Sequence, residues 1–308
     1  METALVKIAY VIAAILFIFG LKKMGHARTA VQGNLLSALG MIVAVVATLV
    51  GIWRRDETFG YIIAGTVVGT TIGIVLALKI KMTAMPQLVA LFNGFGGGAS
   101  VFVAGANLIQ STGRTTDPQS VLIATALSGI IGAVTFWGSL VAFGKLQEIS
   151  WMKKPLRVPS QQLVNAGLAA FVLLLSVLMV TNGSPWMYIV LVIIASVLGL
   201  FLVNPIGGAD MPVVIALLNS YSGLAAAATG FVIDNNVLII AGSLVGASGI
   251  ILTQLMCKAM NRSLFNVLFG VMGTSSSSVD TDGFYANVRT TSADEVAMIL
   301  ETDRKSVV

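Results

Sequence analysis

The chain has 308 residues, of which 56% are apolar and only 10% are charged, with a net charge of +5 and a mean hydropathy of +0.94. Soluble domains average roughly 45–50% apolar and 25% charged residues, so this composition predicts an all-α, polytopic membrane helix bundle. One cysteine (Cys257) and one histidine (His26) exclude a disulfide and a cysteine-based metal site, and leave a histidine-ligated metal or a histidine triad unexpected.

Nine apolar segments are long enough to cross a bilayer core, which takes about 20 helical residues. In chain order they are Leu5–Leu21, Leu35–Trp53, Phe59–Leu78, Met85–Leu108, Val121–Phe143, Leu163–Val180, Trp186–Val203, Met211–Ile233 and Val237–Cys257. Lys22 and Lys23 directly follow the first segment, where no Ala-x-Ala cleavage site is found, so we interpret it as a retained helix and not as a signal peptide.

Lysine and arginine are distributed unequally between the two sides of these spans. One side carries eleven: Lys22, Lys23, Arg28, Lys79, Lys81, Lys145, Lys153, Lys154, Arg157, Lys258 and Arg262. The other side carries four: Lys7, Arg54, Arg55 and Arg114. The positive-inside rule then places the N-terminus outside and the C-terminus in the cytoplasm. Loops beside anionic lipid explain the net charge, so nucleic-acid binding is not needed to account for it.

The fourth and eighth spans begin with the same pattern, at an offset of 126 residues from Met85 to Met211. Positions that match at this offset are Pro86 with Pro212, Ala90 with Ala216, Asn93 with Asn219, Gly97 with Gly223, Ala99 with Ala225 and, upstream, Gly73 with Gly199. Gly132 and Gly246 match in the next spans at a shorter offset of 114. These matches predict one separate helix followed by two parallel four-helix repeats, and internal repeats with a mid-membrane site are typical of transporters.

Asn93 and Asn219 place amide side chains about two turns into their helices. An amide at bilayer depth is costly without a partner or water, so the pair predicts a polar route for protons. Neither amide can ionise, and each would act by ordering water. Hydroxyl side chains that could extend the route are Ser139, Ser222 and Ser248. The alternative is that the amides only bridge helices, as the hydroxyls of membrane helices often bond their own backbone.

Asp210 directly precedes Met211 and Pro212 at a predicted helix start. A carboxylate there can cap the helix, and it can also accept a proton at the entrance to a channel. The matched residue of the first repeat is Ala84, so the acid belongs to one repeat only. Beyond the last span, Arg262 with its neighbours Asn261 and Lys258 stands where a soluble domain would dock.

Two sets of glycines have the spacing of close helix packing. They are Gly94 with Gly98, and Gly65 with Gly69 and Gly73. The run Gly94–Ala99 also fits a dinucleotide-binding pattern, but that pattern requires a strand before it, and here it lies inside an apolar span. We therefore predict helix packing for both sets.

The sequence divides into residues 1–262, a transmembrane proton-translocating domain, 263–291, a polar linker, and 292–308, the start of a soluble domain. Ser292–Glu295 has capping-box spacing before Val296, Ile299 and Leu300, and residues 304–308 resemble the start of a buried strand. We expect this last part to be a truncated Rossmann-like domain.

Several long motifs resemble the beta subunit of proton-translocating nicotinamide nucleotide transhydrogenase. They are Gly207–Ala228, Gly246–Gly249, Met256–Ser263, Phe143–Leu146 and the opening Ala9–Phe19, within a resemblance that runs from about Ala9 to Val308. The resemblance implies an enzyme subunit in which proton passage is coupled to hydride transfer between NAD(H) and NADP(H), with the hydride chemistry in soluble domains and no catalytic residue or metal in this chain. It implies a cytoplasmic NADP(H) domain on the full-length protein, and a partner alpha subunit with the NAD(H) domain and further helices. It also implies a homodimer of alpha–beta pairs in the inner membrane of a bacterium, or of a mitochondrion if the source is eukaryotic.

Carried over by position, Asp210 and Asn219 match residues linked to the proton path, and Arg262 matches the region that joins the channel to the nucleotide domain. Two features depart from the family. Well-known members carry a histidine where this chain has Asn93, which cannot titrate. The chain also ends where the NADP(H) domain begins, so it is not expected to bind either nucleotide itself. The alternatives are a secondary transporter for a small solute, built from parallel repeats, and a scaffold bundle whose amides only pack helices.

Overall fold

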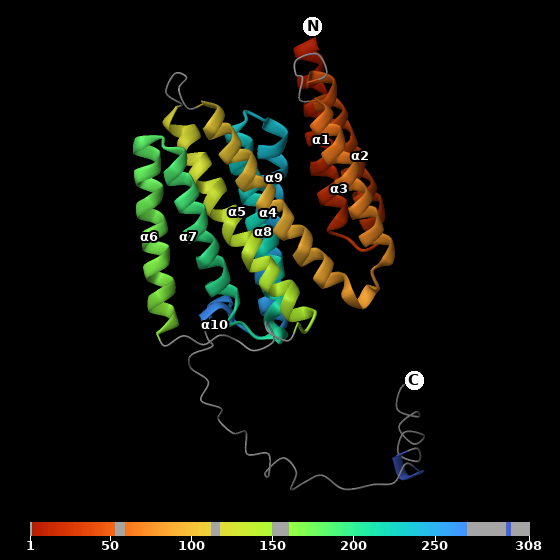
Figure 1. The fold of residues 1–308 in the computed structure, drawn as a ribbon. Helices are drawn as coiled ribbons and strands as arrows, with labels where there is room; N and C mark the ends of the chain where they lie inside the picture. The colour runs from red at the N-terminus through yellow and green to blue at the C-terminus, as the bar shows by residue number, and fades with distance from the viewer. Residues whose placement is uncertain (1, 53–58, 112–117, 150–159, 270–293, 297–308) are drawn as a thin grey trace. The chain divides into compact units, whose positions relative to one another are not determined.

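The structure, a computed structural model, describes residues 2–52, 59–111, 118–149, 160–269 and 294–296 (Figure 1). The long helices are α1 (Glu2–Met24), α2 (Ala30–Ile52), α3 (Phe59–Lys79), α4 (Met85–Ser111), α5 (Gln119–Leu146), α6 (Gln161–Asn182), α7 (Pro185–Val203), α8 (Met211–Val232) and α9 (Asn236–Ala259). Short helices are η1 (Met82–Ala84), η2 (Gly208–Asp210) and α10 (Leu264–Phe269). The chain forms two units, Met1–Phe269 and Gly270–Val308.

The nine predicted spans are confirmed, because nine helices of the described residues are long and apolar enough to cross a membrane. The same residues contain no strand, as expected for an all-α fold. Most helices are longer than the predicted apolar segments, because the residues on either side of each segment are also helical. Lys22 and Lys23, for example, lie in the last turn of α1, where positive charge favours the helix end. The predicted helix after Ser292 is described only at residues 294–296, which are helical, and the predicted strand lies outside the described residues.

The repeat offset of 126 residues recurs in the helix boundaries. The starts of α3 and α7, of η1 and η2, and of α4 and α8 are each separated by this offset. In Figure 1, α4 and α8 begin at the same end of the bundle, the lower end in this view, and run in the same direction. In each repeat a short 3₁₀ turn is followed by a helix whose second residue is proline. The first turn of a helix has no partner for its backbone N–H groups, so the N–H that proline lacks costs no hydrogen bond there.

Matched glycines hold the last two helices of each repeat together. A Cβ added to Gly97 on α4 would lie 2.6 Å from the carbonyl oxygen of Gly132 on α5, and one added to Gly223 on α8 would lie 2.5 Å from the nitrogen of Gly246 on α9. Helices in lipid associate by such close packing, because lipid provides little hydrophobic drive between them. The sequence match of these glycines therefore marks the same helix crossing in both repeats.

Burial is concentrated in α5 and α8. Within an 18-residue stretch of each span, 61% of the α5 residues and 67% of the α8 residues are buried, whereas the stretch in α3 has none. Most buried polar side chains also lie on α4, α5, α8 and α9. These four helices therefore form the polar part of the interior, and the candidate site lies among them.

Candidate functional site

Asn93 bridges the two repeats. Its side chain is buried on α4, and its Nδ2 donates to the carbonyl oxygen of Ile215 on α8 at 3.3 Å. The bond satisfies the amide inside an apolar bundle, where an unpaired one would be costly. This contact is the helix bridge that the sequence left open as an alternative, and a role for Asn93 in proton passage stays a prediction.

Asn219 lies at the same level on the neighbouring helix. A Cβ on Gly96 of α4 would lie 2.7 Å from the Oγ of Ser222 on α8, so the two helices meet closely there. Asn93 precedes Gly96 by three residues and Asn219 precedes Ser222 by three, and both helices run in the same direction. Residues three apart share a helix face, so the structure brings both asparagines to the approach of α4 to α8.

Ser222 also lines a cavity of about 320 Å³ between α8 and α9 on one side and α1 and α2 on the other. Asn219 is half-buried on the same face of α8. Ser37 of α2 provides a second hydroxyl to the cavity, whose walls are otherwise apolar. Asn93 is thus fixed between helices, whereas Asn219 lies on the more open side of α8.

Ser139 lies on the opposite side of the Asn93 region. It is fully buried on α5, and a Cβ on Gly94 would lie 3.3 Å from its Cβ. Its Oγ has no hydrogen-bond partner among the described residues. A buried hydroxyl normally has a partner, so this oxygen carries unused hydrogen-bonding capacity inside the bundle. Ser139 and Asn93 therefore lie near each other, as the predicted route requires.

Ser248 is not brought to this region. It lies on an exposed face of α9, and its Oγ donates to the carbonyl oxygen of Val245 at 3.0 Å. The glycine predictions also divide. Gly94 and Gly98 both face Phe136 of α5, whereas nothing lies within 4 Å of a Cβ added at any of the three α3 glycines, Gly65, Gly69 and Gly73.

Asp210 pairs with Arg262. The distance from Arg262 Nη1 to Asp210 Oδ2 is 3.3 Å, and the side chains are 52% and 14% exposed, respectively. Asp210 occupies the N-cap position of α8, but its side chain makes no capping hydrogen bond. Its other oxygen, Oδ1, is buried and has no partner among the described residues. The carboxylate therefore joins the start of α8 to the end of α9. At this exposure the ion pair contributes at most about 1 kcal/mol to stability.

The end of α9 places Arg262 through its backbone. Asn261 adopts the left-handed conformation with φ 52°, and Arg262 N–H donates to the carbonyl oxygen of Cys257 at 2.9 Å. Asn261 N–H donates to the carbonyl oxygen of Lys258 at 3.1 Å. These two bonds form a Schellman motif, in which asparagine tolerates the left-handed conformation. Lys258 is exposed in the last turn.

Lys145 also lies in this region, although the sequence alone identifies it only as one of the positively charged residues on one side of the membrane. Its Nζ donates to the carbonyl oxygens of Ile206, at 2.7 Å, and of Asn204. Both carbonyls follow the last residue of α7, where an ammonium group favours the negative end of the helix dipole. They also lie in the connection that carries Asp210. No sequence pattern marks such a contact, because it depends on how α5 and α7 are rotated.

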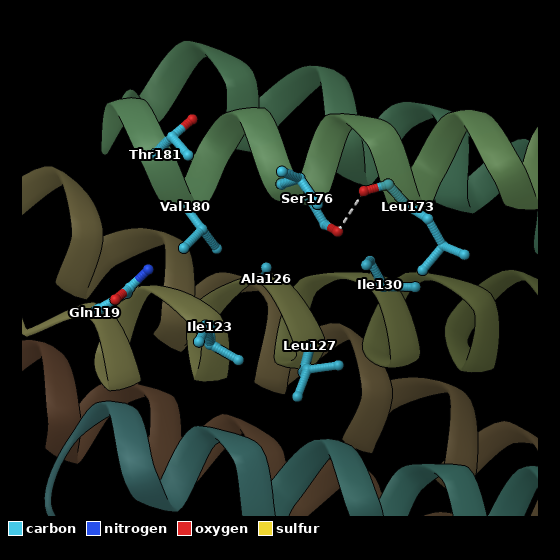
Figure 2. Close-up of a pocket in the computed structure, with 10 residues that line it drawn as sticks. Gln119, Ile123, Ala126, Leu127, Ile130, Leu173, Ser176, Val180 and Thr181 are labelled. Atoms are coloured by element: carbon cyan, nitrogen blue, oxygen red, sulfur yellow. Dashed lines mark hydrogen bonds between the residues drawn. The ribbon is translucent and has the colours of Figure 1, made fainter.

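A second cavity of about 320 Å³ lies between α5 and α6 and contains none of the predicted site residues (Figure 2). Its walls are apolar apart from Gln119, Ser176 and Thr181, and Ser176 Oγ donates to the carbonyl oxygen of Leu173 at 2.7 Å. Across the part of the chain that the structure describes, no group of three histidine, cysteine or acidic residues is arranged to hold a metal.

Comparison with known proteins gives one family. The family model described as NAD(P) transhydrogenase beta subunit matches residues 6–308. The NAD(P) transhydrogenase subunit beta of Rhodospirillum rubrum is 39% identical over 322 residues, which cover 100% of this chain and 67% of the relative. A sequence from a named strain of the same species gives the same values.

Proposed function

The chain belongs to the NAD(P) transhydrogenase beta subunit family, and from that premise we propose that its helix bundle conducts protons while hydride passes between NAD(H) and NADP(H) in soluble domains. Family membership makes it an oxidoreductase subunit, and its apolar helices indicate a multi-pass membrane protein. The hydride chemistry requires bound nucleotides, and we propose that these bind in the soluble domains.

One observation carries the proposal: polar side chains lie where the two repeats touch inside an apolar bundle. Asn93 bonds the backbone carbonyl of Ile215 on α8, Ser139 on α5 holds an unused hydroxyl against the same turn of α4, and Asn219 lies one turn after Ile215 on α8. Such groups are expensive in lipid and usually mark an ion or proton pathway. Because amides and hydroxyls here do not titrate, they would pass protons by ordering water.

Asp210 supplies the carboxylate of the proposed pathway. When ionised it attracts Arg262, and when protonated it loses that attraction. Arg262 directly precedes the segment that leads to α10. Protonation would thereby change how the end of α9 presents the chain that follows, and each protonation state would favour a different docking of the NADP(H) domain.

The wider assembly is part of the proposal. The name of the relatives, a subunit beta, implies an alpha subunit, and we propose that it brings the NAD(H) domain and further helices. NADP(H) would bind the full-length protein, and alpha–beta pairs would form a dimer. The excess of lysine and arginine supports an inner-membrane orientation with the N-terminus outside. The two cavities described above are lined mainly by apolar side chains, which does not favour the transporter alternative.

The test uses the full-length protein with its alpha subunit in proteoliposomes. Proton uptake is followed with a pH-sensitive dye while hydride transfer is followed by absorbance. Asparagine cannot accept a proton in place of the carboxylate, so Asp210→Asn should lower the protons moved per hydride several fold. Asp234→Asn makes the same change at an exposed loop and should match the wild type. Wild-type pumping by Asp210→Asn would refute the proposed route.

A further inference from the structure

We propose that Lys145 is a positioning residue for proton coupling. It holds the connection between α7 and α8, residues 204–210, so that Asp210 stays in place and the end of α9 moves when the Asp210–Arg262 pair breaks. The pair takes its role from the proposed function, on which this inference rests, but the hold of Lys145 on the connection can be measured without proton pumping.

The hold begins with two hydrogen bonds from one ammonium group. Lys145 Nζ donates to the carbonyl oxygen of Ile206 at 2.7 Å and to the carbonyl oxygen of Asn204. Both carbonyls lie beyond Val203, the last residue of α7, where the end of a helix leaves carbonyls without backbone donors. Hydrogen bonds from a charged donor are roughly twice as strong as neutral ones. A side chain of the first repeat therefore fixes the start of the connection in the second.

Packing and a backbone bond hold the rest of the connection. Ile206 is 1% exposed and belongs to the buried cluster that also contains Val203 and Met211, the residues on either side of the connection. Met211, which directly follows Asp210, is fully buried. The N–H of Asp210 donates to the carbonyl oxygen of Gly207 at 3.1 Å. The backbone that carries the carboxylate is therefore anchored both before and after it.

The other partner of the ion pair lies on a less buried segment. Residues 258–263 at the end of α9 are all exposed, and the Arg262 side chain is 52% exposed against 14% for Asp210. The nearest buried residues are Cys257 before this segment and Val267 after it. Segments with few buried contacts open at a lower free energy than packed ones. Breakage of the pair therefore moves the exposed segment between these two anchors and leaves Asp210 in place.

The first repeat contains the matching connection without the same burial. Residues 78–84 match residues 204–210 at the offset of 126. Ile80, which matches Ile206, is half-buried instead of fully buried. The residue that matches Asp210 is an alanine. The more firmly held connection is thus the one that carries the acid.

The lysines that correspond to each other in the two repeats differ in the same sense. Lys145 and Lys258 each lie three residues before a residue with positive φ, Glu148 at 53° and Asn261 at 52°. Lys145 is half-buried against the connection, whereas Lys258 is exposed. The position of the lysine near the helix end therefore does not by itself produce the hold, which depends on the packing of α5 against α7.

Hydrogen exchange of backbone amides shows which of the two segments moves. The full-length protein is assembled with its alpha subunit, and exchange is followed by mass spectrometry on peptides that cover each segment. The N–H of Ile206, bonded to Val203 O at 3.2 Å, reports on the connection. The N–H of Arg262, bonded to Cys257 O at 2.9 Å, reports on the end of α9. Asp210→Asn should speed exchange at Arg262 by a few fold, since an exposed pair contributes little, and leave exchange at Ile206 unchanged.

Removal of the lysine should give the opposite pattern. Lys145→Met should speed exchange at Ile206 by about tenfold or more, because it removes two charge-assisted hydrogen bonds. Lys145→Arg keeps charged donors and should restore most of the protection. Lys79→Met, at the exposed end of α3, is the matched control and should change neither segment. Membrane abundance and a single gel-filtration peak establish that each variant folds, and the Asp210→Asn comparison decides by itself if Lys145→Met does not.

Proton and hydride measurements separate positioning from a purely structural role. In proteoliposomes, Lys145→Met should lower the protons moved per hydride several fold while hydride transfer continues, whereas loss of a purely structural cap would lower both together. Equal loss of both, unchanged exchange at Ile206 in Lys145→Met, or faster exchange at Ile206 in Asp210→Asn would each overturn the proposal. If Asp210→Asn pumps normally but shows the expected exchange pattern, the proton route is rejected and the hold of Lys145 on the connection stands.

Discussion

The crossing of α8 and α9 gives the sharpest test of the packing that positions the site. A Cβ on Gly223 would lie 2.5 Å from Gly246 N, 2.9 Å from Gly242 O and 3.0 Å from Gly246 Cα. All three are backbone atoms that cannot rotate away, so Gly223→Ala must push the helices apart. Overpacking costs about 1–3 kcal/mol, and this contact belongs at the upper end because no flexible side chain can yield.

Separation of the helices would also stretch a second interaction. Ser220 Oγ donates to the carbonyl oxygen of Gly246 at 2.6 Å across the same interface. Its loss adds about 1 kcal/mol, and the gain in helix propensity from glycine to alanine returns about 1 kcal/mol. We therefore expect Gly223→Ala to lower the free energy of unfolding by about 3 kcal/mol.

The assay is unfolding of the purified protein in mixed micelles, followed by circular dichroism as the denaturing detergent is increased. Gly65→Ala is the matched control, because nothing lies within 4 Å of its added Cβ, and it should be neutral or slightly stabilising. If Gly223→Ala unfolded at the same detergent fraction as Gly65→Ala, the close crossing described for α8 and α9 would be wrong.

Two further predictions concern the same bundle. Lys145→Met removes the ammonium group that bonds the connection leading to Asp210, so proton pumping in proteoliposomes should fall several fold. Lys145→Arg should keep most of the pumping, and Lys79→Met, at the exposed end of α3, should keep all of it. Equal pumping in Lys145→Met and Lys79→Met would contradict this role. Ser128→Ala loses a 2.7 Å hydrogen bond to Thr229 and should lower stability by about 1 kcal/mol in the detergent titration with pumping unchanged; a pumping defect would extend the route to that hydroxyl pair.

The membrane spans and the internal repeat could be predicted because both depend on the order of residues along the chain and not on contacts between distant helices. A run of about 20 apolar residues matches the thickness of a bilayer core, whereas the helices of soluble proteins keep a polar face. The offset from Met85 to Met211 recurs in the starts of three pairs of helices. The glycine matches likewise held, since Gly97 and Gly223 meet Gly132 and Gly246.

Contacts between distant helices could not be predicted in the same way. Asp210 and Arg262 are 52 residues apart, and their pairing depends on where α9 ends and how it is rotated. The cap expected of Asp210 is not made, because the carboxylate turns to Arg262 instead. Ser248 shares its residue type with Ser139 but lies on the outer face of α9, a difference that hydropathy alone does not encode.

The proposed proton route depends on the paired asparagines, and Asn219→Leu is the variant that decides whether they line it. Asn219 is half-buried and leucine has nearly its size, so the change removes the amide with little effect on packing. In proteoliposomes with the full-length protein and its alpha subunit, proton uptake per hydride transferred should fall about tenfold or more. Asn182→Leu, at the exposed end of α6, should leave it unchanged. Equal proton uptake by Asn219→Leu and Asn182→Leu would show that the paired amides do not carry the route.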